Sequence, residues 1–279
     1  MPQHALTPAL RAEYTDLFNR CAIRPERAAA VQTLVNALTQ DRTRYAAVGI
    51  PLGIPWHVIA VIHNMESSRN FRTHLHNGDP LAARTTHVPA GRPAKGNPPF
   101  TWEASAADAL AMQGLGAGTD WSLPGTLYQL EAYNGFGYRT HHPQVPSPYL
   151  WSFSTHYSAG KYIADGSWSD SAVSLQCGAA MLLRRMTEQN LAIFADQPPP
   201  TADARPMVMA YATQRPANPA AIAQAITLQN WLSSHPGIFL TPDGIAGRNT
   251  SDAYKRVTGQ YLPGDPRGTP APIGSVPAA

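Results

Sequence analysis

The segment "IPWHVIAVIHNMESSRNF", residues 54–71, has the strongest helical signature in the chain. A proline stands at its start and mostly apolar residues follow, which predicts a buried helix that ends near Ser68. The last turn carries Glu66, at the end of the helix where the dipole disfavours a negative charge. Burial and the dipole both favour the protonated form of a carboxyl group. We therefore expect a raised pKa for Glu66 and interpret it as a candidate general acid, the alternative being a solvated residue at a helix end.

Other helices are predicted on either side of this segment. Residues 6–23 begin with a Thr N-cap and a proline, and residues 24–49 predict one helix that Gly49 and Pro51 end. Further helices are expected at 101–114, within 122–139, where a helix is followed by a glycine break, and in the apolar run 170–189. Residues 72–101 are rich in Gly, Pro, Asn and Thr, which predicts short strands and turns in a hairpin-like segment. The fold class is therefore α+β and mostly helical.

Composition narrows the possible functions. The chain has 279 residues, 43% of them hydrophobic and 14% charged, with a formal net charge of +3. This balance is too weakly basic for a nucleic-acid-binding protein, although it suits an anionic polymer such as cell wall. We expect no signal peptide, no membrane insertion and a soluble monomer that reaches its substrate after release or by another export route. The two cysteines, Cys21 and Cys177, form no CxxC pair and are read as buried thiols or as a disulfide.

A second carboxylate would be needed by an inverting glycoside hydrolase. Asp79 is the first acid after Glu66 and lies at a turn, where it could activate a water or simply bond to its own backbone. Thr85 and Thr86 could position that water if the segment folds over the end of the Glu66 helix. Glu103 is the competing second acid, although the dipole of the following helix explains its position equally well.

Two motifs resemble the lysozyme-like superfamily, especially soluble lytic transglycosylases and goose-type lysozymes. "MESSRNF" at 65–71 is similar to the signature around their catalytic acid, and "LEAYNGFGYR" at 130–139 is similar to their later cleft motif. The resemblance spans roughly residues 50–190. It implies a lysozyme-like fold, with Glu66 as general acid and with Tyr133 and Asn134 lining the cleft. The family's "GLMQ" motif is absent, so hydrolysis and formation of a 1,6-anhydro sugar both stay open.

Additional sugar-binding candidates come from polar and aromatic side chains in the same region. Aromatic faces can stack on sugar rings, and histidine or asparagine can donate hydrogen bonds to them, although each can also serve to pack a loop. The candidates are His76, Asn77, Trp102 and Tyr138. We expect no metal site and no cofactor.

A small second domain is predicted at the C-terminal end. The segment 226–259 resembles the helical peptidoglycan-binding domain, with matches at Leu228, Gln229, Leu232, Asp243, Gly244, Gly247, Thr250, Ala253 and Tyr254. The alternative is a helical packing module without a ligand. The predicted organisation is a catalytic domain at 1–195, a linker at 196–216, the binding domain at 217–265 and a disordered tail at 266–279.

These features together predict an enzyme that cleaves the β-1,4 glycan strands of bacterial peptidoglycan. One alternative is a hydrolase of chitin or chitosan on the same fold. The other is a non-catalytic structural protein that binds the cell wall.

Overall fold

The computed structural model describes residues 4–164, 166–189, 191–192, 194–195, 208–233, 235 and 238–268. The chain divides into two compact units, Met1–Met186 with Phe194–Asp196 and Thr187–Ile193 with Gln197–Ala279. This division lies close to the boundary predicted after residue 195.

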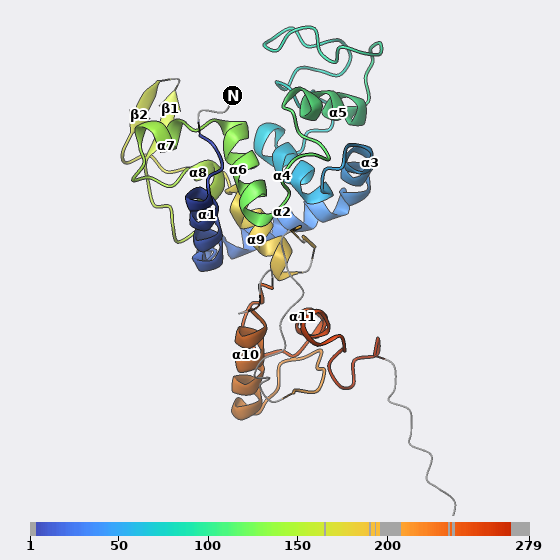
Figure 1. Cartoon of the computed structure of the whole chain (residues 1–279), viewed down its shortest axis with the longest axis vertical. Coiled ribbons are helices and arrows are strands. Elements are labelled where there is room, and N and C mark those ends of the chain that lie inside the picture. The colour runs from blue at the N-terminus through green and yellow to red at the C-terminus, as the bar shows by residue number, and fades with distance from the viewer. Residues whose placement is uncertain are drawn as a thin grey trace, which may run out of the picture. The chain divides into compact units, whose positions relative to one another are not determined.

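The first unit is mostly helical (Figure 1). Its helical elements are α1 (Pro8–Arg20), η1 (Pro25–Arg27), α2 (Ala28–Gln40), α3 (Arg42–Leu52), α4 (Trp56–Ser67), α5 (Trp102–Met112), α6 (Leu123–Asn134), α7 (Gly137–His141), α8 (Pro148–Trp151) and α9 (Ala179–Glu188). Among the described residues its strands are β1 (Lys161–Ala164) and β2 (Ser167–Ser169), which pair antiparallel. A mostly helical α+β arrangement is therefore confirmed.

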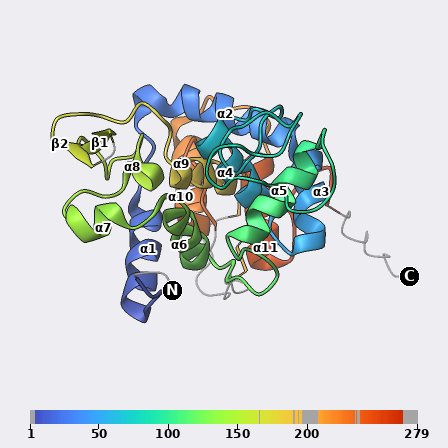
Figure 2. The ribbon, with the colours of Figure 1, turned by 90° about the horizontal axis from the view of Figure 1, so that it is seen from above.

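Helix α4 forms the centre of the first unit. Its residues from His57 to Met65 are all buried, as the apolar pattern of the segment predicts. The helix packs against α2 and α3, and both views place it between α2 and α5 (Figure 2). Because α4 is enclosed along its length, the core fixes the position at which its C-terminal turn reaches the surface.

Side-chain caps confirm several of the predicted helix starts. The hydroxyl of Thr7 accepts a hydrogen bond from the backbone N–H of Leu10, and Thr101 and Ser122 cap α5 and α6 in the same way. Each cap satisfies one of the backbone donors that a helix start leaves unpaired.

The helix predicted over 24–49 is wrong in its boundaries. The chain forms η1, α2 and α3, and it breaks at Asp41, which is a poor residue for a helix interior. Pro51 does not end the helix, because α3 accommodates it in the last turn. The helix ends instead at Gly53, whose φ of 68° is left-handed and favours glycine.

The helix predicted over 170–189 begins later than expected. Residues up to Gly178 are not helical, and α9 starts at Ala179. Ser and Asp are frequent in the first part of the run, where they favour turns over helix. Gly178 packs so closely that an added Cβ would lie 2.3 Å from the carbonyl oxygen of Leu150.

The short strands predicted within 72–101 do not form. The described segment contains one isolated bridge, between Thr73 and Pro80, and otherwise consists of turns and irregular loops. Proline lacks the N–H that a strand ladder requires. Prolines recur at 80, 89, 93, 98 and 99, which explains why no regular hairpin is possible.

Among its described residues the second unit forms the two predicted helices, α10 (Pro219–Ser233) and α11 (Arg248–Thr258). Its apolar core includes Leu228, Leu232, Ile238, Ala253 and Tyr254. These residues include several of the apolar positions in the motif matched at 226–259, so those positions serve the core of the unit.

The polar positions of the same motif bond to one another. The buried amide of Gln229 donates to Asp243 Oδ1 at 2.7 Å and to the carbonyl of Ile245 at 3.0 Å, and it accepts from Gly244 N at 3.0 Å. Thr250 donates to the carbonyl of Ile245 at 3.1 Å. The motif therefore builds the turn between α10 and α11, and wall binding by this unit stays a prediction.

Two of the predicted boundaries of the second unit are wrong. Within the predicted linker 196–216, Met209 and Tyr211 pack against the core of the unit, and Tyr211 N donates to Pro263 O. Within the predicted tail 266–279, Arg267 forms ion pairs with Asp252 and Asp265. The rest of both segments lies mostly outside the described residues.

Cys21 and Cys177 are both buried free thiols, so the disulfide alternative is not adopted. In the described parts of the chain, no individual helix is long and apolar enough to cross a bilayer. Among these residues, only the pair α3 and α4 is together long and apolar enough to span a bilayer by length and composition, and the two helices are bent by 116° relative to each other.

Candidate functional site

The C-terminal turn of α4 leads into an unusual backbone conformation directly after Glu66. Ser68 and Arg69 are consecutive non-glycine residues with φ values of 49° and 64°. The backbone N–H of Arg69 turns back to the carbonyl of His63 at 3.2 Å. Left-handed residues other than glycine cost free energy and are found preferentially at functional sites. The strain therefore marks the end of α4 as a place where precise positioning matters.

Glu66 extends from this turn and accepts a hydrogen bond from Tyr149 Oη at 2.8 Å. The side chain is exposed rather than buried, which corrects the expectation of a covered acid. Nevertheless, the surrounding protein removes part of the carboxylate's hydration and raises the pKa of Glu66, while the hydrogen bond from Tyr149 opposes that rise. The predicted direction of the pKa shift is confirmed, and the catalytic role of Glu66 remains a prediction.

Tyr133 lies in the last turn of α6 and is electrostatically coupled to Glu66. Burial raises the pKa of the Tyr133 phenol, and the negative charge of Glu66 raises it further. Asn134, the next residue, is solvent-exposed where α6 ends at Gly135. The two motifs on which the resemblance rests thus contribute Glu66 and Tyr133 to one site.

Tyr149 and Gln176 lie beside the end of α4 although neither was among the predicted site residues. Burial, followed by the charge of Glu66, raises the pKa of Tyr149 well above its usual value. Gln176 Nε2 donates to the carbonyl of Met65 at 2.8 Å, which anchors the segment before α9 to the end of α4. Tyr149 stands among several other aromatic residues in the sequence, and no spacing distinguishes it from its neighbours.

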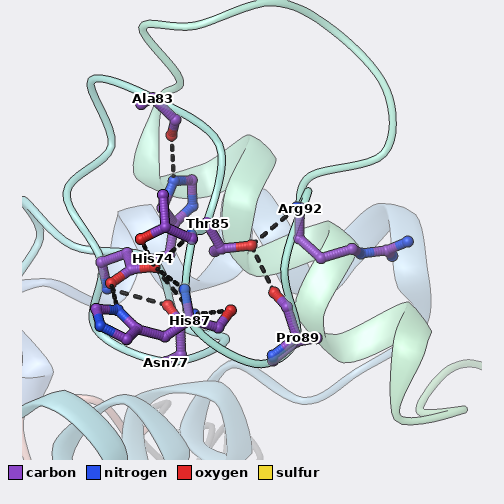
Figure 3. A network of polar contacts seen from close by, with 9 residues as sticks. His74, Asn77, Ala83, Thr85, His87, Pro89 and Arg92 are labelled. Carbon is purple, nitrogen blue, oxygen red and sulfur yellow. Dashed lines mark hydrogen bonds and ion pairs between the residues drawn. The ribbon is translucent and has the colours of Figure 1, made fainter.

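Asp79 forms a dense network of hydrogen bonds with residues that include Asn77 and His87, both labelled in Figure 3. Its Oδ2 accepts from Thr86 N at 2.7 Å and from His87 N at 3.0 Å, and its Oδ1 lies 2.6 Å from His87 Nδ1. The hydrogen bonds from the backbone and ring of His87, then that from the backbone of Thr86, hold the pKa of Asp79 far below its usual range. Such a carboxylate is a weak base, and its contacts explain Asp79 as the organiser of its loop.

The neighbouring polar candidates complete this loop. Thr85 Oγ1 donates to Pro89 O at 2.5 Å and accepts from Arg92 N at 2.8 Å, so its hydroxyl is engaged within the loop. Asn77 donates to Asp79 and to His87 O, and accepts from Asp79 N. Thr86 is exposed and its hydroxyl faces Asp79 at 3.3 Å. These bonds account for the three residues structurally, and their catalytic or sugar-binding roles stay untested predictions.

The loop is also tied to α5. His74 contacts Ser105 Oγ through Nδ1 at 2.7 Å and the carbonyl of Ala83 through Nε2 at 2.8 Å. His76 Nε2 lies 2.8 Å from Asp108 Oδ2, and the His76 side chain is fully covered. Because a covered ring offers no surface to a ligand, His76 is not placed to bind a sugar in this conformation.

Glu103, the alternative second acid, is paired with Arg44 at 2.7 Å. Partial burial acts to raise the pKa of Glu103, but the hydrogen bond and charge of Arg44, together with a backbone hydrogen bond at the start of α5, lower it overall. The same guanidinium lies 3.8 Å from the ring centroid of Phe71. Glu103 therefore has a structural partner, as its position in the first helical turn also suggests.

Two aromatic candidates belong to the interior. Trp102 is 1% exposed and packs against Tyr45, His63 and Phe71. Tyr138 is 9% exposed and packs against the β1–β2 hairpin. Neither ring presents an open face on which a sugar could stack, which corrects the interpretation of both as substrate-binding residues.

Comparison of the chain with family models, curated proteins and solved structures gives no significant match. Within the described residues, no group of three His, Cys, Asp or Glu side chains could hold a metal ion. The functional argument therefore rests on the geometry around Glu66.

Proposed function

We propose that the first unit cleaves a glycosidic bond in a β-1,4-linked amino-sugar polysaccharide, with peptidoglycan as the substrate and Glu66 as general acid. The observation that carries the proposal is the raised pKa of a solvent-accessible carboxyl group held by Tyr149. A carboxyl group whose pKa is raised keeps its proton to higher pH, which favours its protonating a leaving glycosidic oxygen. The resemblance of the two motifs to lysozyme-like enzymes supports the choice of substrate.

The hydrogen bond from Tyr149 sets which oxygen of Glu66 can act. Tyr149 Oη donates to Oε1, so the acidic proton resides on Oε2. Transfer of this proton to the glycosidic oxygen accompanies cleavage of the bond to C1 and leaves Glu66 as a carboxylate. Oε1 keeps its hydrogen bond throughout, which stabilises the negative charge as it forms.

The contacts of Asp79 and Glu103 favour a mechanism with a single acid. Both carboxylates are engaged by structural partners, and the pKa of each is lowered. In such a mechanism the C6 hydroxyl of the sugar attacks C1, and the Glu66 carboxylate takes up the hydroxyl proton. The product is a 1,6-anhydro sugar and no water is consumed.

Mass spectrometry of the products from purified peptidoglycan tests this mechanism. The new sugar ends should be lighter by one water than reducing ends, and the Glu66→Gln protein should release neither product. Reducing ends would assign hydrolysis, with a second group activating water. Cleavage of chitin in preference to peptidoglycan would favour the chitinase-type alternative, and absence of cleavage by the wild-type chain would favour the non-catalytic one.

We also propose that the second unit retains the enzyme on insoluble wall. Tethering raises the effective substrate concentration without changing the chemistry. A chain that ends at residue 195 should bind sedimented wall more weakly and cleave short soluble fragments at the wild-type rate. Circular dichroism controls for folding. If the full chain and the truncated chain sediment equally with the wall, the second unit is a packing module and not a wall-binding domain.

A further inference from the structure

A pocket of about 230 Å³ lies in the first unit, and its lining does not include Glu66, Tyr133, Tyr149 or Gln176. Three segments form it, namely residues 24–27 around η1, residues 152–158 after α8, and residues 173–174 before α9. The volume is many times the roughly 10–15 Å³ that one water requires. None of the motifs considered for glycan cleavage contributes to this pocket.

Two arginines give the pocket its positive character. The guanidinium of Arg24 donates to the carbonyls of Ser154 at 3.0 Å and Tyr157 at 2.9 Å, so it is held in one orientation. The guanidinium of Arg27 lies 4.7 Å from the ring centroid of Phe153. In the described part of the chain, no carboxylate forms an ion pair with Arg27. A half-buried arginine that is positioned but unpaired is a recognition group for a planar anion.

The wall of the pocket is preorganised. Phe153 adopts φ 72°, the left-handed region that non-glycine residues rarely occupy. Its carbonyl accepts from Arg24 N at 2.9 Å, and the neighbouring Ser152 Oγ donates to Ser174 O at 3.2 Å. These bonds fix the strained residue beneath Arg27. Strain that the surroundings maintain in this way is typical of ligand sites.

The remaining lining limits the kind of anion. Glu26 adds one negative charge, which disfavours a doubly charged anion such as phosphate. Phe153 and Val173 provide apolar surface, and Val173 is 48% exposed. One carboxylate beside a small apolar side chain matches this combination of charge and surface.

We propose that this pocket binds the free carboxylate of a short peptide with small side chains, with Arg27 as the principal cation. The carboxylate pairs with Arg27, and the peptide's side chain packs on Phe153 and Val173. The proposal does not depend on the role of Glu66, so the Glu66→Gln protein should bind the peptide as the wild type does.

Titration of the full chain with N-acetyl-alanyl-alanine, followed by calorimetry or NMR, tests the pocket. The C-terminal amide of the same peptide should bind at least tenfold more weakly, because a hydrogen-bonded charge is lost. Arg27→Gln should weaken binding of the acid by about tenfold and leave binding of the amide unchanged. Arg42→Gln is the matched control, because Arg42 also lies over an aromatic ring, that of Trp56 at 5.1 Å, outside the pocket.

Circular dichroism verifies that both variants are folded, and Arg27→Lys should restore part of the affinity. Equal affinity for acid and amide would overturn the proposal, as would wild-type binding by Arg27→Gln or no binding by the wild type. Inorganic phosphate that binds as tightly as the peptide would also overturn it, because the pocket would then select charge alone.

Discussion

Glu66 and Asp79 are two carboxylates in the first unit with opposite environments. Glu66 accepts one hydrogen bond, from Tyr149, and loss of hydration raises its pKa. Asp79 accepts bonds from Asn77, Thr86 and His87, and these bonds lower its pKa although the residue is only 8% exposed. The comparison teaches that exposure alone does not set the proton affinity of an acid. The number of donors that replace water decides it.

The largest expected effect comes from removing the acid of Glu66. Glu66→Gln keeps the shape of the side chain and can still accept from Tyr149, but it cannot deliver a proton. General acid catalysis contributes about 10²–10⁴-fold, so kcat on soluble peptidoglycan fragments should fall by at least about 100-fold. A folded Glu66→Gln protein with turnover near the wild-type rate would refute the role proposed for Glu66.

Several helix starts and the end of α4 near Ser68 were predictable because they depend on local signals. Thr7, Thr101 and Ser122 cap their helices, and the apolar run of α4 is long enough to identify a buried helix. The contact between Tyr149 and Glu66 was harder to predict, because Tyr149 comes from a distant part of the chain. No local pattern encodes such a contact.

The segment 72–101 shows that its irregular character could be predicted from the sequence, whereas its hydrogen bonds could not. Its turn residues correctly indicate an irregular region, but the bonds within it depend on which donors reach Asp79. Sequence spacing made Asp79 a plausible partner for Glu66 across a scissile bond. The structure shows that Thr86 and His87 occupy its oxygens, an arrangement set by three-dimensional folding of the loop.

The next largest effect should come from Asp79→Asn, and it should appear in stability. An amide cannot accept from all the donors that the carboxylate satisfies, so the melting temperature at pH 7 should fall by several degrees, roughly the size expected for a lost buried network. The folded pKa of Asp79 is lowered, so its stabilisation is present above the unfolded pKa of about 3.9 and is lost as the pH falls. The difference between the two proteins should therefore narrow below about pH 4.

Asp16→Asn provides the control, because Asp16 forms an exposed ion pair with Arg20 and should contribute little. Calorimetry at pH 3 and pH 7 measures the stability, and turnover below the melting transition measures the chemistry. A strong loss of turnover in Asp79→Asn, with unchanged stability, would instead assign Asp79 as the base of a hydrolase.

A smaller effect is expected from Tyr149→Phe. The Tyr149 hydroxyl lowers the pKa of Glu66, so its removal should raise that pKa further. Because Glu66 acts when protonated, the alkaline limb of the pH–rate profile should move to higher pH. Tyr133→Phe is the control, since its coupling to Glu66 is through charge. A limb that stays in place, or moves to lower pH, would contradict the assignment of Tyr149.

The smallest effect is the influence of Glu66 on stability, and its sign should be opposite to that of Asp79. The folded pKa of Glu66 is raised, so the protonated form adds stability below the unfolded pKa of about 4.3, and this is lost as the pH rises through the folded pKa. Glu66→Gln should therefore melt at a slightly higher temperature than the wild type at pH 7, with no difference below about pH 4. Because Glu66 is open to solvent, we expect a gain of only about one or two degrees. A lower melting temperature for Glu66→Gln at pH 7 would show that the fold favours the carboxylate, and the contrast between the two acids would then fail.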